Sequence, residues 1–379
     1  MMSGSDSLTN RAKRYSTRKY SLAIIGIIYL LLLLFLFQGL GLSKLLAFRL
    51  SKTVTNNFFV TPLYIAIVYL AYYILNFPLN FYQAFILEHK FSLSNQKIGD
   101  WFKDQIKAGV IFYLIALILV SAFYYILRHY FRTWWLIISL FWIFFSLVLA
   151  KLTPVVIIPL FFKYKKFSDD TLKERILQLG DKMKVKVLDV FEIDFSKKTL
   201  KANAAFVGIG NTKRVILADT LKDKYNYDEI TVILAHEFAH YRLKHLIKLI
   251  LFNSAVTIIL FYIIFITSDS FLSIFGLNSL WDLAALPIIL IYFTIFGSIM
   301  QPLENYISRR LEKNADMLAL KITGLKKAFI SAMEKLSLQN LADRNPHPVI
   351  KFFFFDHPPI DERIHMAKSP QKVGHLPIR

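Results

Sequence analysis

The stretch LAHEFAHYRLKHLIKLILFNSAVTIILFYIIFITS, residues 234–268, joins a polar motif directly to a long apolar run. Its first part carries His236 and His240 four residues apart, with Glu237 next to the first histidine. Its second part, from about 249 to 268, is as long as the ~20 residues that a helix needs to cross a bilayer. The stretch therefore predicts a polar site built against a membrane.

Five further apolar blocks of this kind occur in the chain, which has 379 residues, 55% of them hydrophobic and 19% charged. The first block is too long for a secretory signal and no small-residue cleavage site follows it, so we expect it to be retained. We predict a mostly α-helical, polytopic membrane protein of about six spans. The six blocks lie at about 20–43, 57–80, 108–127, 133–150, 249–268 and 283–303.

The net charge of +20 is explained by cations that flank the spans, so it does not indicate nucleic acid. Five of these cations lie in the first 20 residues and predict a cytoplasmic N-terminus: Arg11, Lys13, Arg14, Arg18 and Lys19. Six crossings return the C-terminus to the same side, whereas loop 44–52 runs against the rule with Lys44, Arg49 and Lys52. We expect a bacterial inner membrane or an endoplasmic reticulum membrane, with the active site and both termini on the cytoplasmic side.

The organisation that these patterns predict alternates membrane and non-membrane parts. The parts are a disordered basic N-terminus at 1–19, a four-span region at 20–151, the first part of a catalytic domain at 152–246, two spans at 247–303 and the second part of that domain at 304–379. A helical pattern covers 169–184, and alternating runs predict a strand at 187–195 and a hairpin turning at Gly210-Asn211. The absence of cysteine from the sequence excludes disulfides, thiolate nucleophiles and cysteine ligands.

The spacing of His236 and His240 favours a zinc site, because residues i and i+4 share one helix face and can bind one cation. Glu237 flanks such a cation, where the general base of a metal-assisted hydrolase lies. A catalytic zinc ion needs a third protein ligand. The stretch 304–320, directly after the last span, offers Glu312 and Asp316, again four residues apart.

The assignment of the third ligand stays open at this point. We favour Glu312 as the ligand and Asp316 behind it, fixing a ligand imidazole, but spacing alone also allows Asp316 to be the ligand. A solvated helix face would also explain the two carboxylates, through ion pairs with Arg309, Arg310 and Lys313.

Three motifs in order resemble the integral-membrane CAAX prenyl proteases of type 1: H-E-x-x-H at 236–240, N-x-x-S-R-x-x-E-x-x-A-D at 305–316 and H-P-P-x-x-E-R at 357–363. The similarity spans roughly residues 57–370. It implies a zinc metalloendopeptidase with one Zn2+ ion, the ligands His236, His240 and Glu312, and the base Glu237. Family members commonly have seven spans, and the span that is missing here is expected to be the first.

The resemblance also implies roles for three residues outside the zinc motif. His357 matches a histidine that stabilises the oxyanion, and Asn203 and Arg363 match residues that line the substrate site. Without the family, His357 reads as a loop residue and Asn203 as a turn residue. Without the family, Arg363 is expected to form a surface ion pair with Asp361 or Glu362.

The function we expect is hydrolysis of peptide bonds in membrane-associated substrates, such as the C-termini of prenylated proteins, with the substrate extended along the strand after Asn203. A prenyl-independent protease for membrane-protein quality control has the same chemistry and is the close alternative. A non-catalytic scaffold or transporter is the third reading, and the intact set of base and ligands argues against it.

Overall fold

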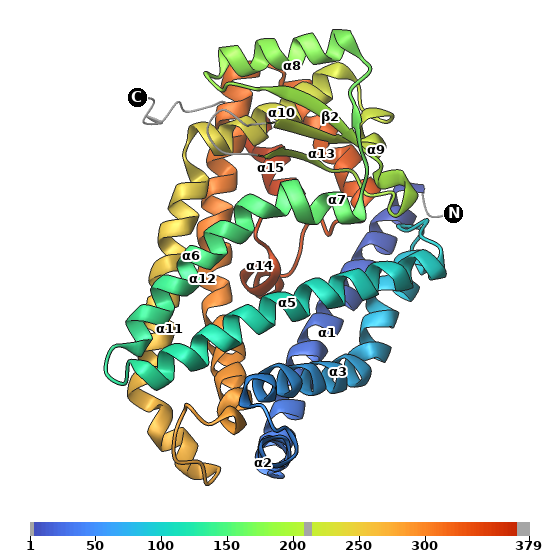
Figure 1. Ribbon diagram of the computed structural model, residues 1–379. Coiled ribbons are helices and arrows are strands. Elements are labelled where there is room, and N and C mark those ends of the chain that lie inside the picture. The colour runs from blue at the N-terminus through green and yellow to red at the C-terminus, as the bar shows by residue number, and fades with distance from the viewer. Residues whose placement is uncertain (1–3, 208–213, 370–379) are drawn as a thin grey trace.

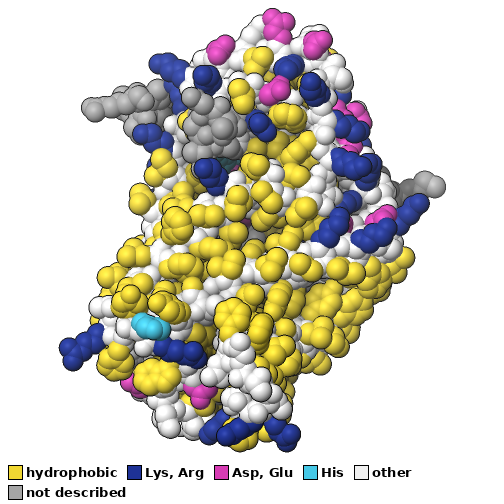
Figure 2. Space-filling view, in the orientation of Figure 1, with side chains coloured by type: hydrophobic (Ala, Val, Ile, Leu, Met, Phe, Trp, Pro, Cys, Tyr) yellow, Lys and Arg dark blue, Asp and Glu magenta, His cyan; other side chains and the backbone are white. Residues whose placement is uncertain are grey.

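The computed structural model describes residues 4–207 and 214–369. Among these residues, six helical segments are long and apolar enough to cross a membrane, which confirms the predicted spans. Many of their large apolar side chains are exposed, and Figure 2 shows a broad yellow surface below the charged upper end. The six segments are Thr9–Gly39, Asn57–Lys90, Ile98–His129, Trp134–Phe161, His245–Ile274 and Leu283–Thr323. The protein is therefore an integral membrane protein.

The helices of the membrane part form the lower body of the molecule (Figure 1). Single π-helical turns at 82–86 and 153–157 interrupt two of the spans, and the second of these turns contains Pro154. The elements are α1 (Gly4–Gly39), α2 (Leu42–Thr53), η1 (Asn57–Phe59), α3 (Val60–Phe81), η2 (Tyr82–Ile86), α4 (Leu87–Lys90), α5 (Ile98–His129), α6 (Trp134–Leu152), η3 (Thr153–Ile157), α7 (Ile158–Phe161), α11 (His245–Ile274), η6 (Leu283–Ala285) and α12 (Leu286–Thr323).

The prediction of a disordered N-terminus is wrong for the residues that the structure describes, because α1 begins at Gly4. Tyr15 is buried, and its hydroxyl donates to Glu88 at 2.6 Å and accepts from Lys201 at 3.0 Å. The hydroxyl of Ser16, also buried, donates to the carbonyl of Leu341 at 3.2 Å. These tertiary contacts offset the conformational entropy that this basic, polar segment loses when it becomes ordered.

The segment predicted as loop 44–52 is also helical and lies at the opposite end of the molecule, as α2 (Figure 1). Gly41 adopts φ +69° and turns the chain between α1 and α2. The buried hydroxyl of Ser43 donates to the carbonyl of Ala284 and contacts the hydroxyl of Tyr64, each at 2.7 Å. This packing against η6 fixes the short helix.

A small mixed sheet with its helices forms the upper end of the molecule (Figure 1). Its strand order is β1-β2-β4-β3, with β2 and β4 parallel and the two outer pairs antiparallel. The predicted turn at Gly210-Asn211 lies outside the described residues, and β3 and β4 on either side of it pair as predicted. The elements are β1 (Tyr164–Lys166), α8 (Asp170–Lys182), β2 (Asp189–Ile193), η4 (Phe195–Lys197), β3 (Ala204–Val207), β4 (Arg214–Ala218), α9 (Asp219–Lys222), α10 (Tyr227–Arg242), α13 (Lys326–Asn340), α14 (Pro348–Phe354) and α15 (Ile360–Lys368).

One hydrophobic core joins segments on both sides of the last two spans. Leu172 of α8 and Leu234 of α10 are buried in the same cluster as Leu318 of α12, Phe329 of α13 and Ile364 of α15. The two non-membrane segments therefore fold as one unit over the ends of α11 and α12.

The helices that carry the two pairs of candidate ligands, α10 and α12, enter this unit differently. Helix α10 starts with a capping box between Asn226 and Glu229 and ends before Lys244, whose φ of +56° separates α10 from α11. Helix α12, by contrast, runs unbroken from the membrane to Thr323, so the boundary expected at 303/304 lies inside one helix. Because α10 packs against α12, motifs more than 70 residues apart meet.

Candidate metal centre

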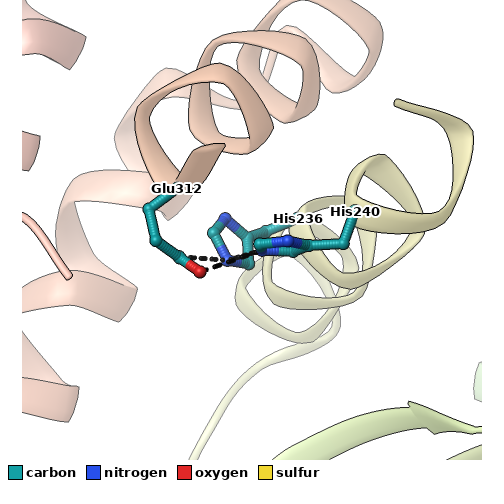
Figure 3. A group of neighbouring side chains, drawn as sticks. All are labelled: His236, His240 and Glu312. Atoms are coloured by element: carbon teal, nitrogen blue, oxygen red, sulfur yellow. Dashed lines mark hydrogen bonds and ion pairs between the residues drawn. The ribbon is translucent and has the colours of Figure 1, made fainter. Parts of the chain in front are cut away.

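His236, His240 and Glu312 face one another across the contact of α10 and α12, as Figure 3 shows. The Nε2 atoms of the two histidines are 3.0 Å apart. Glu312 places Oε2 at 3.1 Å from Nε2 of His236 and Oε1 at 3.2 Å from Nε2 of His240. Ligand atoms of a tetrahedral zinc site, with bonds of ~2.0–2.1 Å, stand about 3.3 Å apart, so the observed separations fit such an ion.

The hydrogen-bond partners around His236 also fit a cation. Nδ1 of His236 lies 2.8 Å from Oδ1 of Asp316, which fixes the Nδ1–H tautomer of the neutral ring. Nε2 of His236 then presents a lone pair to Nε2 of His240 and to Glu312. Glu312 Oε2 is buried without a hydrogen-bond donor. Three electron-pair donors converge on one point, and a divalent ion there satisfies all three.

The electrostatics of His236 point the same way. Burial lowers the pKa of this imidazole, but Asp316 and Glu312 outweigh burial and raise the pKa to about 10. The carboxylates around His236 therefore stabilise a positive charge at this position.

Glu237 follows His236 on α10 and is half-buried. Burial raises the pKa of its carboxyl group, and the imidazoles of His236 and His240 lower it. A carboxylate whose pKa is shifted upward next to a metal-binding group can accept a proton at neutral pH.

His357 lies on the open side of the group, with 52% of its side chain exposed. Its Nε2 is 3.4 Å from Glu312 Oε2, and its Nδ1 is 2.9 Å from Oδ1 of Asp356. Burial of the ring lowers the pKa of His357, but Asp356 and Glu312 raise it above its ordinary value. The charged ring can therefore donate a hydrogen bond from Nε2 to an oxygen at this site.

Asn203 lies directly before β3, is exposed, and accepts the backbone N–H of Ala218 at its carbonyl at 3.1 Å. Strand β3 is the last strand of the sheet order, so its outer edge is not paired within the described sheet. It also lies along α10, where the rings of Phe206 and Phe238 have centroids 4.9 Å apart. An extended peptide on this edge would run beside the helix that carries both histidines.

Asp316 and Arg363 form a buried pair behind the three ligand atoms. Arg363 donates from Nε and Nη2 to the two carboxylate oxygens of Asp316, at 2.8 and 2.6 Å. It makes this bidentate pair instead of one with Asp361 or Glu362, which bond Arg344 and Lys351. Arg363 therefore orients Asp316, which orients His236, and its expected contact with substrate stays a prediction.

Sequence reasoning gave no role to His245, which is buried at the start of α11. Its Nδ1 lies 3.1 Å from Nδ1 of His240, so the two rings share a hydrogen bond that directs Nε2 of His240 toward His236 and Glu312. A helical periodicity does not predict this contact, because the left-handed residue Lys244 lies between the two histidines.

Comparisons with known proteins match the chain in two adjoining parts. Residues 167–371 match peptidase family M48, and residues 4–163 match the domain described as "CAAX prenyl protease N-terminal, five membrane helices". The described residues of 4–163 contain four candidate spans, one fewer than the five helices in that description.

The relatives are similar over most of the chain. "Uncharacterized metalloprotease YhfN" of Bacillus subtilis is 30% identical over 96% of this chain and 86% of that protein. "CAAX prenyl protease 1" of Saccharomyces cerevisiae is 30% identical over 77% of this chain and 68% of that protein. The crystal structure of S. mikatae Ste24p has the same fold, with a TM-score of 0.87 over 96% of this chain and 90% of that one, at 24% identity.

Proposed function

The chain belongs to peptidase family M48 and is a membrane metalloprotease of the CAAX prenyl protease type, and we propose that its metal is one zinc ion bound by His236, His240 and Glu312. The observation that supports this proposal is the convergence of three ligand atoms that lie within 4.8 Å of one another. Two nitrogens and one carboxylate are a common ligand set of catalytic zinc.

Glu237 is the general base in this proposal. A bound zinc ion would supply a Lewis acid that makes water acidic and polarises a peptide carbonyl. The carboxylate of Glu237 takes a proton from water and then gives it to the leaving amine. His357 donates from Nε2 to the oxygen that becomes negative, with Asp356 holding its Nδ1.

The substrate lies extended on the outer edge of β3 and starts beside Asn203. An edge strand offers backbone N–H and C=O groups to a peptide, so most of the binding is independent of side chains. Asn203 is exposed at the beginning of that edge, where its amide can bond the backbone of the substrate. Sequence selection along the peptide is then loose.

The substrate class is a lipidated C-terminal peptide that cannot leave the membrane. Helix α12 carries Glu312 on the same continuous helix that crosses the bilayer, so the site lies within a few turns of the hydrocarbon. The yeast relative is named a CAAX prenyl protease. We place the site and both chain ends on the cytoplasmic side, because a cluster of Lys and Arg before the first span favours the cytoplasmic side for that end.

Cleavage of matched peptides tests the substrate class. Purified protein with added zinc is given two synthetic C-terminal peptides of one sequence, with and without a farnesyl thioether. We expect kcat/KM to be at least about 10-fold higher for the farnesylated peptide, since the buried apolar chain adds binding energy. Glu237→Gln is the matched inactive control.

Equal cleavage of the two peptides would instead select the prenyl-independent quality-control protease. Absence of cleavage of either peptide in the zinc-loaded protein would overturn the proposed enzyme.

A further inference from the structure

One face of α12 carries more of the site than the metal ligand. Asn305, Arg309, Glu312 and Asp316 are spaced by four, three and four residues, so all four side chains lie on the same face. Glu312 faces the two histidines and Asp316 holds His236 and Arg363. Asn305 and Arg309 are closer to the membrane on this face, and the mechanism gives them no part.

Both side chains bind the end of α14, the short helix drawn in red beside α12 in Figure 1. The amide of Asn305 is buried and donates to the carbonyl of Phe353 at 2.7 Å. The guanidinium of Arg309 donates from Nη1 to the carbonyls of Lys351 and Phe355. These carbonyls lie in the last turn of α14 and at the residue after it, where a cation is favourable, and the carbonyl of Lys351 also accepts the backbone N–H of Phe355.

The end of α14 leads directly to the open side of the metal group. Phe355 is extended and ends the helix, and His357 follows two residues later. Among the described residues, the ion pairs of the His357 side chain are with its neighbour Asp356 and, at 3.4 Å, with Glu312. The place of its ring is therefore set by where the chain leaves α14.

We propose that Asn305 and Arg309 are positioning residues that set the distance between His357 and the metal ligands, by fixing the carbonyl end of α14 to the helix that carries Glu312. This inference rests on the proposed function of His357. One rigid helix then fixes both sides of the reaction site. Glu312 binds the metal, and Arg309, about one turn away, holds the end of α14 that leads to the oxyanion donor His357. A shift of ~1 Å in such a donor costs on the order of 100-fold in rate.

The test compares three variants, Arg309→Met, Arg309→Lys and Asn305→Asp, with the control Arg310→Met and with a His357→Ala background. Arg309→Met keeps the length of the side chain but removes its donors, and Asn305→Asp keeps the shape but puts an acceptor against the carbonyl of Phe353. Arg310→Met is the matched control, because Arg310 is exposed and its guanidinium lies over the ring of Tyr306 on the same helix. His357→Ala is made alone and together with Arg309→Met. Zinc content, thermal midpoint, kcat and KM are measured for each protein.

We expect Arg309→Met and Asn305→Asp to lower kcat at least about 10-fold, with KM and zinc content within about 2-fold of wild type. Arg310→Met should leave kcat unchanged, and Arg309→Lys should recover part of the loss, because it restores a charged donor. In the His357→Ala background, Arg309→Met should lower kcat by less than about 2-fold, since the residue it positions is gone.

Wild-type kcat in Arg309→Met would overturn the inference, and so would a full further loss in the His357→Ala background. If Arg309→Met does not fold, Arg309→Lys and Asn305→Asp decide by the same measurements. A wild-type protein that cleaves no peptide would instead count against the proposed function, and the variants would then carry no kcat to compare.

Discussion

Individual residues at the metal centre have different roles, as ligands or as the base. His236 has its Nδ1 bonded to Asp316 and its Nε2 turned to Glu312 and His240, so the ring is oriented before any ion binds. His240 receives the same support from His245. Glu237 is not one of the three converging ligands and has no such bond among the described residues, so its carboxylate can accept a proton. The ligands and the base can therefore be tested independently.

Replacing Glu237 by Gln removes the proton acceptor and keeps the shape of the side chain. We expect zinc content to stay equal to wild type and kcat to fall on the order of 100-fold or more, the range that general base catalysis supplies. The measurement pairs elemental analysis of zinc with peptide cleavage. Glu334→Gln, on the exposed face of α13, is the control. An active Glu237→Gln protein would remove Glu237 from the mechanism.

Replacing Glu312 by Gln tests the ligand assignment that spacing left open. Gln keeps the volume, so we expect at least a 10-fold weaker zinc affinity with little loss of fold. Asp316→Asn should weaken zinc binding less, because Asp316 acts through His236. It should lower the thermal midpoint more, since the buried Arg363 loses its charged partner. The opposite order of zinc affinities would make Asp316 the ligand.

At the scale of the element, the start of α10 decides whether the histidines stand on a stable helix. The side chain of Asn226 accepts the backbone N–H of Glu229, and Glu229 accepts the backbone N–H of Asn226, both at 2.9 Å. Glu229 is buried and also accepts from Ser331 at 2.6 Å and Lys335 at 2.7 Å, both on α13. The cap therefore ties the metal-binding helix to the helix that follows α12.

The pH dependence of stability follows from this cap. Burial raises the pKa of Glu229, but its bonds to Lys335, Ser331 and Asn226 outweigh burial and lower the pKa below the ordinary 4.5. Because the folded-state pKa is depressed, the stabilisation is complete above about pH 4.5 and is lost as the pH falls through the folded-state pKa. We expect the thermal midpoint of wild type to drop more steeply than that of Glu229→Gln between pH 5 and pH 3. Parallel curves would contradict the assignment of this acid loss to Glu229.

At the scale of the whole molecule, the six spans place the two ends of the fold on opposite sides of the bilayer. The sheet, the metal group and the start of α1 lie at one end, and α2 lies at the other (Figure 1). Five cations at the α2 end, Lys44, Arg49, Lys52, Arg128 and Arg132, make no ion pair among the described residues. They run against the usual charge asymmetry, so the orientation needs a direct measurement.

Single cysteines can report this orientation, because the chain has none of its own. Lys182→Cys marks the end of α8 beside the sheet, and Lys52→Cys marks the end of α2, both at exposed positions. A membrane-impermeant maleimide should label Lys52→Cys in intact cells or right-side-out vesicles and Lys182→Cys only in inverted ones. Labelling of both from one side would contradict the six-span topology, and the reversed pattern would place the metal group outside.

Much of this architecture could be predicted from local sequence. The spans follow from block length, and α8, the strands at 189–193 and 214–218 and the start of α10 follow from periodicity and capping residues. The helices at 4–19 and 44–52 could not be predicted, because they are stabilised by distant partners such as Glu88, Leu341 and Ala284. Local propensity carries no information on such partners.

The sequence by itself determined that this is a six-span membrane protein with two histidines on one helix face and a base beside them, because periodicity and block length are local properties of the chain. Only the tertiary structure brought Glu312 to those histidines, put Asp316 and Arg363 behind them, and anchored the segment of His357 through Asn305 and Arg309. These residues lie more than 60 positions from α10, and their distances depend on how α12, α14 and α15 pack on it, which no short-range pattern encodes.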